Sequence, residues 1–434
     1  MEFLGGLLIF LAILIGYLIL VSILAKKGIL KRHNISLAGP MLMFRTKRGL
    51  NLLDRLAKPT RFWKIFGSIS VVLCFILMIG LVVFMIVSIP AYSQISPEAA
   101  PTPQMILVIP GINPLLPLEY LVYVIIALAA GVVIHEFSHG ILLRAQQMKV
   151  KSLGLLYMIV PLGAFTEEDE EELKSVEKRK RLRVLAVGPT SNFVLALVCM
   201  ILFSVVMLGN VTPVAEGVVI ANVEGEFEGI KEGMIITAIN NQKIDGVDTY
   251  VKVAEKLPKG EPARLSLYEK GKGSSVANFV FRGTPSDTSK EEGKYPHPLP
   301  FDHKRYLETL SNPFQPRTFA IYFSLPLLRF QGEVAFPSEL KAAYLTPFNE
   351  GVFWFIEDLL YWTFWLNLLI GLTNILPIAA LDGGQMFNDA VDEVLKRLRI
   401  KEASRKKMVS AIGMSFTLIL LIVLIAVPLI VPRI

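Results

Sequence analysis

Charged residues and cysteines are both scarce in this chain of 434 residues. Charged residues make up 19% of it, whereas soluble domains carry nearer ~25%. The two cysteines, Cys74 and Cys199, both lie within apolar runs, which excludes a disulfide framework and a metal site built from thiols alone. Hydrophobic residues reach 53% and the mean hydropathy is +0.54. This composition excludes a purely soluble enzyme, a disordered chain and a fibre, and predicts that much of the chain lies in lipid.

Six segments are long and apolar enough to cross a bilayer, which takes about 20 residues of helix. Four of them are uncharged, and the other two are interrupted by polar residues. The six are Phe3–Ala25, Ile65–Ile89, Leu118–Leu143, Val184–Leu208, Leu359–Leu381 and Met408–Val431. The first has no basic stretch before it and no small-residue cleavage site, so we expect a retained span rather than a signal peptide.

Basic residues orient these spans. Residues 26–64 carry eleven Lys or Arg against the single acid Asp54, residues 385–407 carry seven, and Pro90–Pro117 carries none. By the positive-inside rule the basic loops are cytoplasmic and both termini face outward. The net charge of +7 therefore reflects topology and contact with the anionic lipids of the bilayer, and no nucleic-acid partner is expected.

This orientation leaves Gly209–Gly351 as an extracytoplasmic insert with room for its own core. Its first part predicts short strands, a short helix at Tyr250–Lys256 and a turn at Asn240–Asn241. The strands are Gly217–Val223, Met234–Ile239, Arg264–Tyr268 and Ala277–Phe281. The aromatic run Phe319–Phe323 is compatible with a further strand.

The stretch GIKEGMIITAIN at residues 229–240 resembles PDZ domains, and the resemblance covers roughly residues 215–283. In PDZ domains a Gly-rich loop before a strand captures a carboxyl terminus or an extended peptide. Gly217–Ile220 would be that strand, and main-chain hydrogen bonds at an open sheet edge would supply the affinity. A small β-domain without this function is the alternative.

The sequence His135-Glu136-Phe137-Ser138-His139 interrupts the third predicted span. Helical spacing puts the two histidines one turn apart on a single face, so both imidazoles can bind one metal ion. Glu136 can reach a metal-bound water as general base. Three ionisable groups within five residues of an apolar span are costly, which indicates a functional site rather than a chance pattern or a polar stripe.

Asp382 is the candidate third ligand. A catalytic zinc usually takes three protein ligands and leaves one position to water, and Asp382 ends the fifth predicted span near the cytoplasmic side, as the histidines do in the third. The alternative is that Asp382 caps a cytoplasmic helix at Gln385–Leu398. The residues alone leave the metal open, since iron or cobalt could occupy the same ligands.

HExxH combined with the distant stretch NILPIAALDGG at residues 374–384 resembles the site-2 proteases, zinc metalloproteases that cut within membranes. With the PDZ-like insert, the chain is similar to the PDZ-bearing bacterial and archaeal branch. The resemblance implies a Zn²⁺ cofactor held by His135, His139 and Asp382, with Glu136 as the catalytic base.

The stretch Gly188–Asn192, GPTSN, looks like the GPxxN motif of that family. The resemblance implies that Asn192 lies beside the metal and that Asn192, Asn374 and Pro377 bind substrate. The structural alternatives are a helix-bending proline and amides that join helices.

Ser152–Phe165 is uncharged but too short to span. In site-2 proteases the corresponding region is a re-entrant β-hairpin with an open edge near the metal. A substrate helix must unwind before it can be cut, and its freed backbone groups cost several kcal/mol each in hydrocarbon. Pairing with such an edge would satisfy them. An ordinary interfacial hairpin is the alternative.

We therefore predict a polytopic α-helical membrane protein with six transmembrane helices, a re-entrant β-hairpin and an extracytoplasmic PDZ-like α+β insert. Five parts follow one another along the chain. Residues 1–117 hold two spans and a basic loop, 118–208 the first part of the catalytic core, 209–283 the PDZ-like domain, 284–351 an extension of unassigned fold, and 352–434 the rest of the core with the last span.

The predicted activity is hydrolysis of a peptide bond within or near the transmembrane segment of a single-span protein, close to the cytoplasmic side of the cell membrane. The resemblance also implies regulated intramembrane proteolysis, with the PDZ-like domain excluding bulky ectodomains or binding a newly exposed carboxyl terminus. Two rival interpretations are a non-catalytic PDZ-bearing scaffold and a metal transporter that moves the ion along the intramembrane His and Asp side chains.

Overall fold

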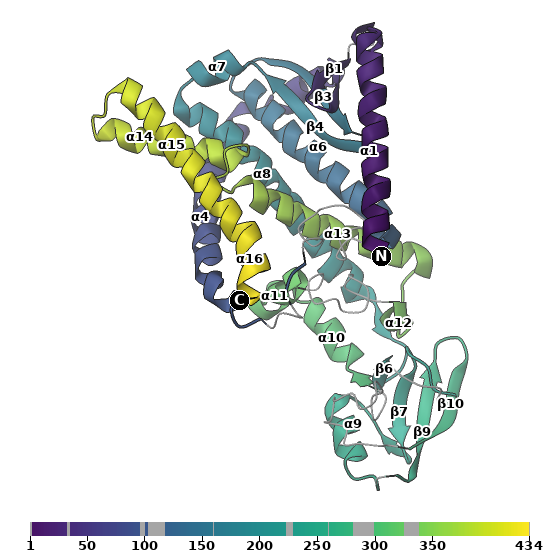
Figure 1. Ribbon diagram of the computed structural model, residues 1–434. Coiled ribbons are helices and arrows are strands. Elements are labelled where there is room, and N and C mark those ends of the chain that lie inside the picture. Colours follow the sequence, from purple (N-terminus) through teal and green to yellow (C-terminus); the bar gives the residue numbers. More distant parts are fainter. Residues whose placement is uncertain are drawn as a thin grey trace. The chain divides into compact units, whose positions relative to one another are not determined.

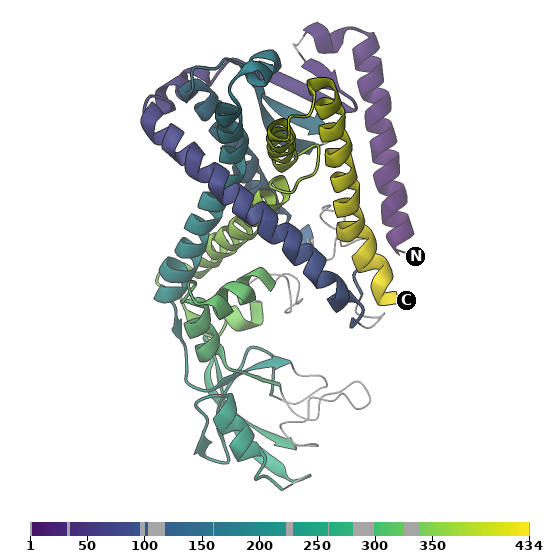
Figure 2. The ribbon, with the colours of Figure 1, turned by 90° about the vertical axis from the view of Figure 1, so that its left-hand side faces the viewer.

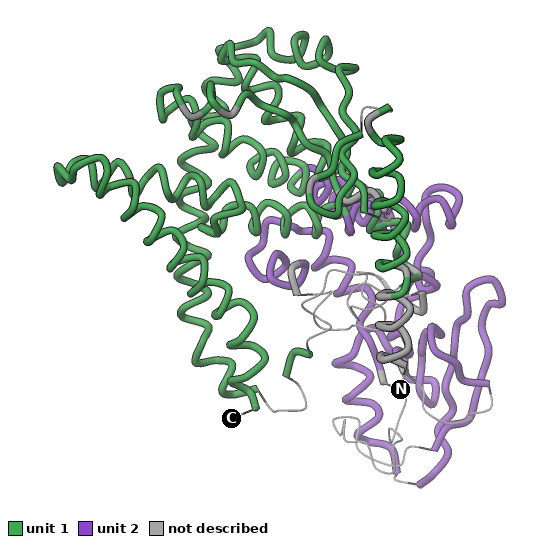
Figure 3. The backbone as a smooth tube through the Cα atoms, turned by 45° about the horizontal axis from the view of Figure 1, so that its top comes forward, with its two compact units in different colours: residues 1–197, 363–434 green, residues 198–362 purple. Residues whose placement is uncertain are grey.

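The computed structural model describes residues 2–32, 35–95, 100–102, 118–158, 160–222, 229–258, 260–280, 299–324 and 338–433. The chain divides into two units (Figure 3): unit 1 comprises Met1–Leu197 and Thr363–Ile434, and unit 2 comprises Val198–Trp362. The predicted insert falls within unit 2, and all the predicted site residues fall within unit 1.

Five helical segments in the described part of the chain are long and apolar enough to cross a membrane. They contain α4 (Thr60–Tyr92), α6 (Leu121–Ala145), α8 (Lys178–Ile201), α13 (Glu350–Asn374) and α15 (Glu402–Leu421). The predicted span Phe3–Ala25 lies in α1 (Glu2–Lys26), of which Leu14–Lys26 is apolar but short. The chain is thus a multi-pass membrane protein, while the sixth span stays a prediction.

Short helical elements extend or flank these helices. After α8 come η2 (Leu202–Met207) and η3 (Leu208–Asn210), and after α15 come η4 (Ile422–Ala426), α16 (Val427–Ile430) and η5 (Val431–Arg433). η2 and η3 belong to unit 2. Further short helices of unit 1 are α2 (Ile29–Arg32), α3 (Leu50–Leu56), η1 (Leu118–Tyr120) and α7 (Glu170–Ser175). The end of α4 lies beside α16 (Figures 1 and 2).

The fifth predicted span differs from the helix that the structure contains. α13 ends at Asn374, whereas the prediction ran to Leu381, so that boundary is wrong. Pro377 follows closely, and the residue before a proline is disfavoured in helical conformation. Tight turns, in which Ile378 N–H donates to Leu376 O at 2.7 Å, then lead into α14 (Asp382–Arg397).

A buried apolar cluster joins α4, α8 and the chain around α14. Its members come from segments far apart in the sequence, and they hold together the helices that carry the site. They are Cys74, Met78, Leu185, Ala186, Ile375 and Met386. The Cys74 thiol also lies 3.5 Å from Ala186 O, so α4 and α8 approach closely there.

Unit 1 contains an antiparallel sheet in the order β1-β2-β3-β4. β3 (Val150–Met158) and β4 (Val160–Glu168) form a hairpin over the predicted Ser152–Phe165 segment. β1 (Ile35–Ala38) and β2 (Met41–Thr46) come from the basic loop, and β2 pairs with β3. The sequence analysis missed β1 and β2. They pair with each other locally, with Ala38 opposite Met41, but only the pairing of β2 with the distant β3 adds them to a larger sheet. Whether the hairpin enters a membrane stays a prediction.

Unit 2 contains a sheet in the order β10-β9-β7-β6-β11, with β8 beside β7. The strands are β6 (Val218–Asn222), β7 (Ile235–Ile239), β8 (Gln242–Lys243), β9 (Pro262–Glu269), β10 (Gly273–Val280) and β11 (Leu299–Phe301). The predicted strands are confirmed within the described residues, outside which Val223 and Phe281 lie. The predicted helix is present as α9 (Val247–Ala254), which begins before Tyr250 and ends before Lys256. Positive φ angles of 47° and 67° at Asn240 and Asn241 confirm the turn.

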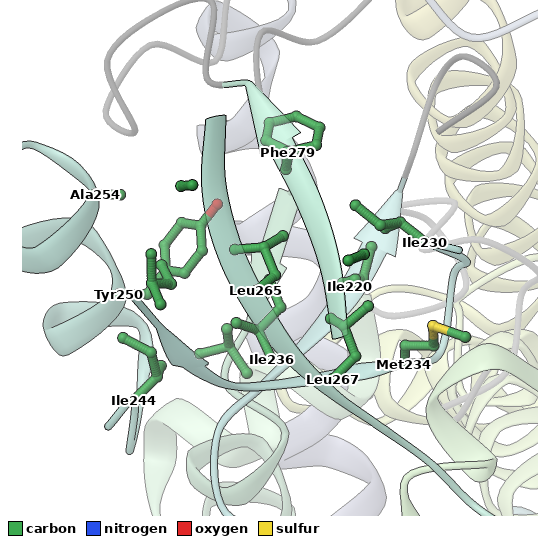
Figure 4. Close-up of a cluster of buried hydrophobic side chains, with 14 residues drawn as sticks. Ile220, Ile230, Met234, Ile236, Ile244, Tyr250, Ala254, Leu265, Leu267 and Phe279 are labelled. Atoms are coloured by element: carbon green, nitrogen blue, oxygen red, sulfur yellow. The ribbon is translucent and has the colours of Figure 1, made fainter. Parts of the chain in front are cut away.

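Apolar side chains on one face of this sheet form a buried core together with α9. Tyr250 of α9 is fully buried and faces Leu265 and Ile236 (Figure 4). The other elements of unit 2 are β5 (Thr212–Pro213), α10 (His303–Leu310), α11 (Pro316–Ser324), α12 (Ser338–Lys341) and β12 (Tyr344–Leu345).

Two predictions in the insert are wrong. Gly217–Ile220 is not an open edge, because β11 pairs with β6, with Phe301 opposite Val219. Phe319–Phe323 lies in the helix α11 rather than in a strand. Thr318 and Tyr322, one helical turn apart, are both fully buried, and this burial on one face outweighs the strand preference of an aromatic run.

Candidate metal centre

The three predicted metal ligands lie together in unit 1. His135 and His139 come from α6, and Asp382 is the first residue of α14. Their ligand atoms all lie within 4.8 Å of one another. Asp382 Oδ2 lies 3.1 Å from His135 Nε2 and 3.4 Å from His139 Nε2. The carboxylate and both imidazoles therefore face one common point.

The Nδ1 atom of each histidine is engaged on the side away from Asp382. His135 Nδ1 lies 2.7 Å from Asn192 Oδ1, and His139 Nδ1 lies 2.7 Å from Val184 O. Both partners are oxygen acceptors, so each Nδ1 carries the proton and each Nε2 presents a lone pair. An outer hydrogen bond of this kind fixes the tautomer and orientation of a metal-binding histidine.

This arrangement fits a zinc ion. Two neutral imidazoles and one carboxylate are an established catalytic donor set, and ligand bonds of about 2.0–2.2 Å place neighbouring donors ~3.3 Å apart. Gly188 on α8 leaves space at the same point. A Cβ atom there would lie 2.7 Å from His135 Nε2 and nearer still to His139 Nε2.

The first turn of α14 sets the position of Asp382. A Cβ atom on Gly383 or Gly384 would collide with the carbonyls of Ile375 and Ile378, so this close approach requires both glycines. Asp382 itself begins the helix, and Leu381 occupies the N-cap position without a side-chain bond. The interpretation of Asp382 as a helix cap is therefore wrong.

Ion pairs fasten α14 to α8. Arg181 Nε donates to Asp389 Oδ2 at 2.7 Å, and its Nη2 donates to Oδ1. Lys178 and Arg405 both bond Asp392. Burial raises the pKa of Asp392, but these two cations outweigh it and hold the pKa below its ordinary value. The pairs therefore persist at neutral pH and keep α14 in register with α8.

Glu136 lies beside the ligands and is held by β4. Thr166 N–H donates to Glu136 Oε2 at 2.8 Å, and the Thr166 hydroxyl donates to Glu136 O at 2.6 Å. Thr166 was not among the predicted site residues, because a threonine in a β-strand carries no motif. One carboxylate oxygen of Glu136 is thus oriented by the edge of the sheet.

The three predicted substrate-binding residues differ in their surroundings. Asn192 is fully buried and bonds His135, which supports an orienting role. Asn374 donates to Ile370 O within its own helix at 3.1 Å, and Pro377 lies in the turn before α14. Substrate binding by all three stays a prediction.

The sequence analysis missed Asn367, a fully buried amide on α13. Its Nδ2 donates to Thr363 O at 2.8 Å, and its Oδ1 accepts from Asn192 Nδ2 at 2.9 Å. Because a carbonyl can only accept, Thr363 O determines which way the Asn367 amide points. Asn192 Nδ2 also donates to Gly131 O at 3.0 Å, and the two acceptors together direct Asn192 Oδ1 toward His135. Asn367 and the Gly131 carbonyl therefore set the tautomer of His135 together, both through Asn192.

Replacing Asn367 by leucine is expected to weaken metal binding by about 10–100-fold, the usual cost of losing an outer-shell partner. Asn192 Nδ2 would lose one of its two acceptors and keep only Gly131 O at 3.0 Å, so the Asn192 amide would be held less firmly. Metal affinity of the full-length protein, measured by competition with a chelator, checks this. Asn374→Leu is the matched control, since it removes an amide of the same helix that bonds only Ile370 O among the described residues. Equal metal affinities in the two variants would show that Asn367 does not orient Asn192.

Comparisons with known proteins place this centre in a family. Residues 123–420, more than half of the chain, match the model of peptidase family M50. The uncharacterized protein MJ0971 of Methanocaldococcus jannaschii is 26% identical over 84% of this chain and 80% of its own length. The putative zinc metalloprotease CPE1693 of Clostridium perfringens is 23% identical over 64% and 89%. The zinc metalloprotease RasP of Geobacillus kaustophilus is 24% identical over 56% and 57%.

The chain belongs to peptidase family M50, the site-2 protease family. It is accordingly a membrane metalloprotease, and the family implies a zinc cofactor. The resemblance found in HExxH and NILPIAALDGG is thereby confirmed at the level of the family.

Proposed function

We propose that this protein is an intramembrane zinc endopeptidase that cuts a single-span membrane protein within or near its transmembrane segment. The observation that carries the proposal is the convergence of His135, His139 and Asp382 beside Glu136, on helices apolar enough to lie in a bilayer. Ionisable groups at that depth are costly and mark function.

The residues divide the chemical work among them. His135 Nε2, His139 Nε2 and Asp382 Oδ2 would hold zinc, which supplies a Lewis acid that acidifies water and polarises a carbonyl. Thr166 N–H holds Glu136 Oε2, so we assign the proton to Oε1. Glu136 would take it from the attacking water and return it to the departing amine, as a general base and then a general acid.

The edge of the hairpin sheet suits an extended substrate. β4 is an end strand in the order β1-β2-β3-β4, and its Thr166 N–H points at Glu136. A substrate segment unwound along β4 would exchange its lost helical hydrogen bonds for strand pairing. Its peptide bonds would then lie close to the carboxylate that moves the proton.

The insert would act outside the cytoplasm, as the positive-inside rule predicts. We infer that its PDZ-like domain screens the ectodomain of the substrate, because β11, the end strand that covers the predicted peptide-binding strand β6, is short and contains Pro300, which has no N–H to offer a peptide. Capture of a newly exposed carboxyl terminus is the alternative. Either role fits regulated intramembrane proteolysis of a substrate already shortened by another protease.

Metal content and cleavage together test this function. We expect about one zinc per chain in the detergent-purified full-length protein, as catalytic sites of this donor set hold. His135→Ala and Asp382→Ala should lose the metal, whereas Asp248→Ala, an exposed acid on α9, should keep it. The wild type and Asp248→Ala should cut single-span substrates in proteoliposomes, whereas His135→Ala and Asp382→Ala should not.

Three outcomes would contradict the proposal in whole or in part. A wild type that takes up no zinc after reconstitution would favour the non-catalytic scaffold. Zinc movement across sealed vesicles without any cleavage would favour the transporter. Full zinc occupancy in Asp382→Ala would show that Asp382 is not a metal ligand.

A further inference from the structure

A groove of about 630 Å³ opens on unit 1 between α4, α8 and α14. Part of its lining is apolar and comes from α4, namely Val71, Val72 and Phe75. Another part is charged: it includes Arg179 and Arg183 from the first turns of α8, and the acids Asp389 and Glu393 of α14, which pair with Arg181 and Lys178. None of the candidate metal ligands lines this groove, so it is a separate feature of the unit.

Two guanidinium groups in the groove, those of Arg179 and Arg183, differ in their partners from the neighbouring cations Lys178 and Arg181. Lys178 and Arg181 are neutralised by acids of α14. Arg183 Nε donates instead to the Ser68 hydroxyl at 3.0 Å. In the described part of the chain, no carboxylate forms an ion pair with Arg179 or Arg183 within 4.0 Å. Uncompensated positive charge therefore remains where the groove meets α8.

The apolar part of the groove continues into an exposed apolar face of α4. Ile69, Val72 and Ile76 lie on one side of this helix and are 59%, 59% and 62% exposed. Exposed apolar side chains at such spacing on a membrane helix face acyl chains. The groove therefore joins a lipid-facing surface to a pair of unpaired arginines.

A single class of ligand matches both features. A phosphate can take two parallel hydrogen bonds from a planar guanidinium, and basic pockets between membrane helices on the cytoplasmic side bind anionic headgroups. The positive-inside rule assigns this end of α4 and α8 to the cytoplasm. We propose that the groove binds one anionic glycerophospholipid, with its phosphate at Arg179 and Arg183 and an acyl chain along Val72 and Phe75.

The bound lipid has a structural consequence for the metal centre. The groove bridges α8, which carries Gly188 and the Val184 carbonyl, and α14, which begins at Asp382. A headgroup held between these helices adds to the Arg181–Asp389 pair in keeping α14 on α8. The lipid site stands on its own contacts and does not depend on the proposed peptidase activity.

Lipid binding to the full-length protein in neutral detergent tests the site. Phosphatidylglycerol is titrated against phosphatidylcholine, and bound lipid is counted by native mass spectrometry. The double variant Arg179→Gln/Arg183→Gln should weaken phosphatidylglycerol binding by about 30-fold, since each basic residue near an anionic lipid contributes about fivefold. The double variant Lys406→Gln/Lys407→Gln is the matched control. It removes the same charge from exposed positions of α15 and should change binding no more than about twofold, because exposed charges are screened.

Two further measurements distinguish binding of the whole lipid from binding of a phosphate group alone. Val72→Trp fills the apolar part of the groove from an exposed position, so it should fold and still weaken lipid binding. Inorganic phosphate alone should neither compete with the lipid nor raise the melting temperature. Equal lipid binding by both double variants, or full competition by free phosphate, would overturn the proposal.

Discussion

Alanine in place of Gly188 is expected to abolish metal binding while leaving the fold intact. The added Cβ would occupy the point that both Nε2 atoms face, 2.7 Å from that of His135. His139 on α6 cannot move away, because its Nδ1 bonds Val184 O, which lies on α8 together with Gly188. We expect metal affinity to fall at least about 100-fold, the upper end for loss of a supporting contact. Elemental analysis of the purified protein measures this directly.

Gly80→Ala is the matched control for Gly188→Ala. Gly80 also lies in a membrane helix, α4, but a Cβ there meets nothing within 4 Å. Alanine stabilises a helix by about 1 kcal/mol relative to glycine, so neither variant should lose helix content by circular dichroism. Wild-type zinc content in Gly188→Ala would show that the metal lies elsewhere.

Glutamine in place of Glu136 is expected to lower the cleavage rate by about 10²–10⁴-fold, the usual contribution of a positioned proton-transfer group. The amide oxygen can still accept from Thr166 N–H, as Glu136 Oε2 does at 2.8 Å. Metal binding should therefore persist, because only the ability to take a proton is lost. The measurement is the rate on a single-span substrate that the wild type cuts, together with the zinc content.

Glu172→Gln provides the comparison for Glu136→Gln. Glu172 also accepts a hydrogen bond from a backbone amide, that of Lys149, at 3.0 Å, but on α7 and away from the metal centre. Its neutralisation should leave the rate within about twofold, as for most surface changes. If Glu136→Gln cut as fast as this control, the assigned base would be wrong.

The central site residues were predictable because their signals are local. HExxH needs only the helical period to place His135 and His139 on one face. Each ionisable group within an apolar span costs free energy, so the span around this motif indicated a functional site rather than a chance pattern. Asp382 required an argument about membrane depth, which hydropathy and loop charge supplied. That argument selected the acid that lies beside both histidines, although it placed the end of the fifth span at Leu381 instead of Asn374.

The residues around the ligands were not predictable in the same way. Asn367, Thr166 and the space at Gly188 act through contacts between segments that are far apart in the chain. A buried asparagine in an apolar helix is equally compatible with helix packing. Its role in orienting His135 follows only from the order of donors and acceptors along the amide chain.

The sequence by itself determined which segments are apolar, which side chains could bind zinc, and which short strands alternate in the insert. These properties depend on residue type and on periods of two to four residues. Only the tertiary structure decided that β1 and β2 of the basic loop join the hairpin sheet, and that β11 covers β6. It also decided that α14 begins at Asp382 against α8. Such choices depend on packing and hydrogen bonding between distant segments, which a local pattern cannot record.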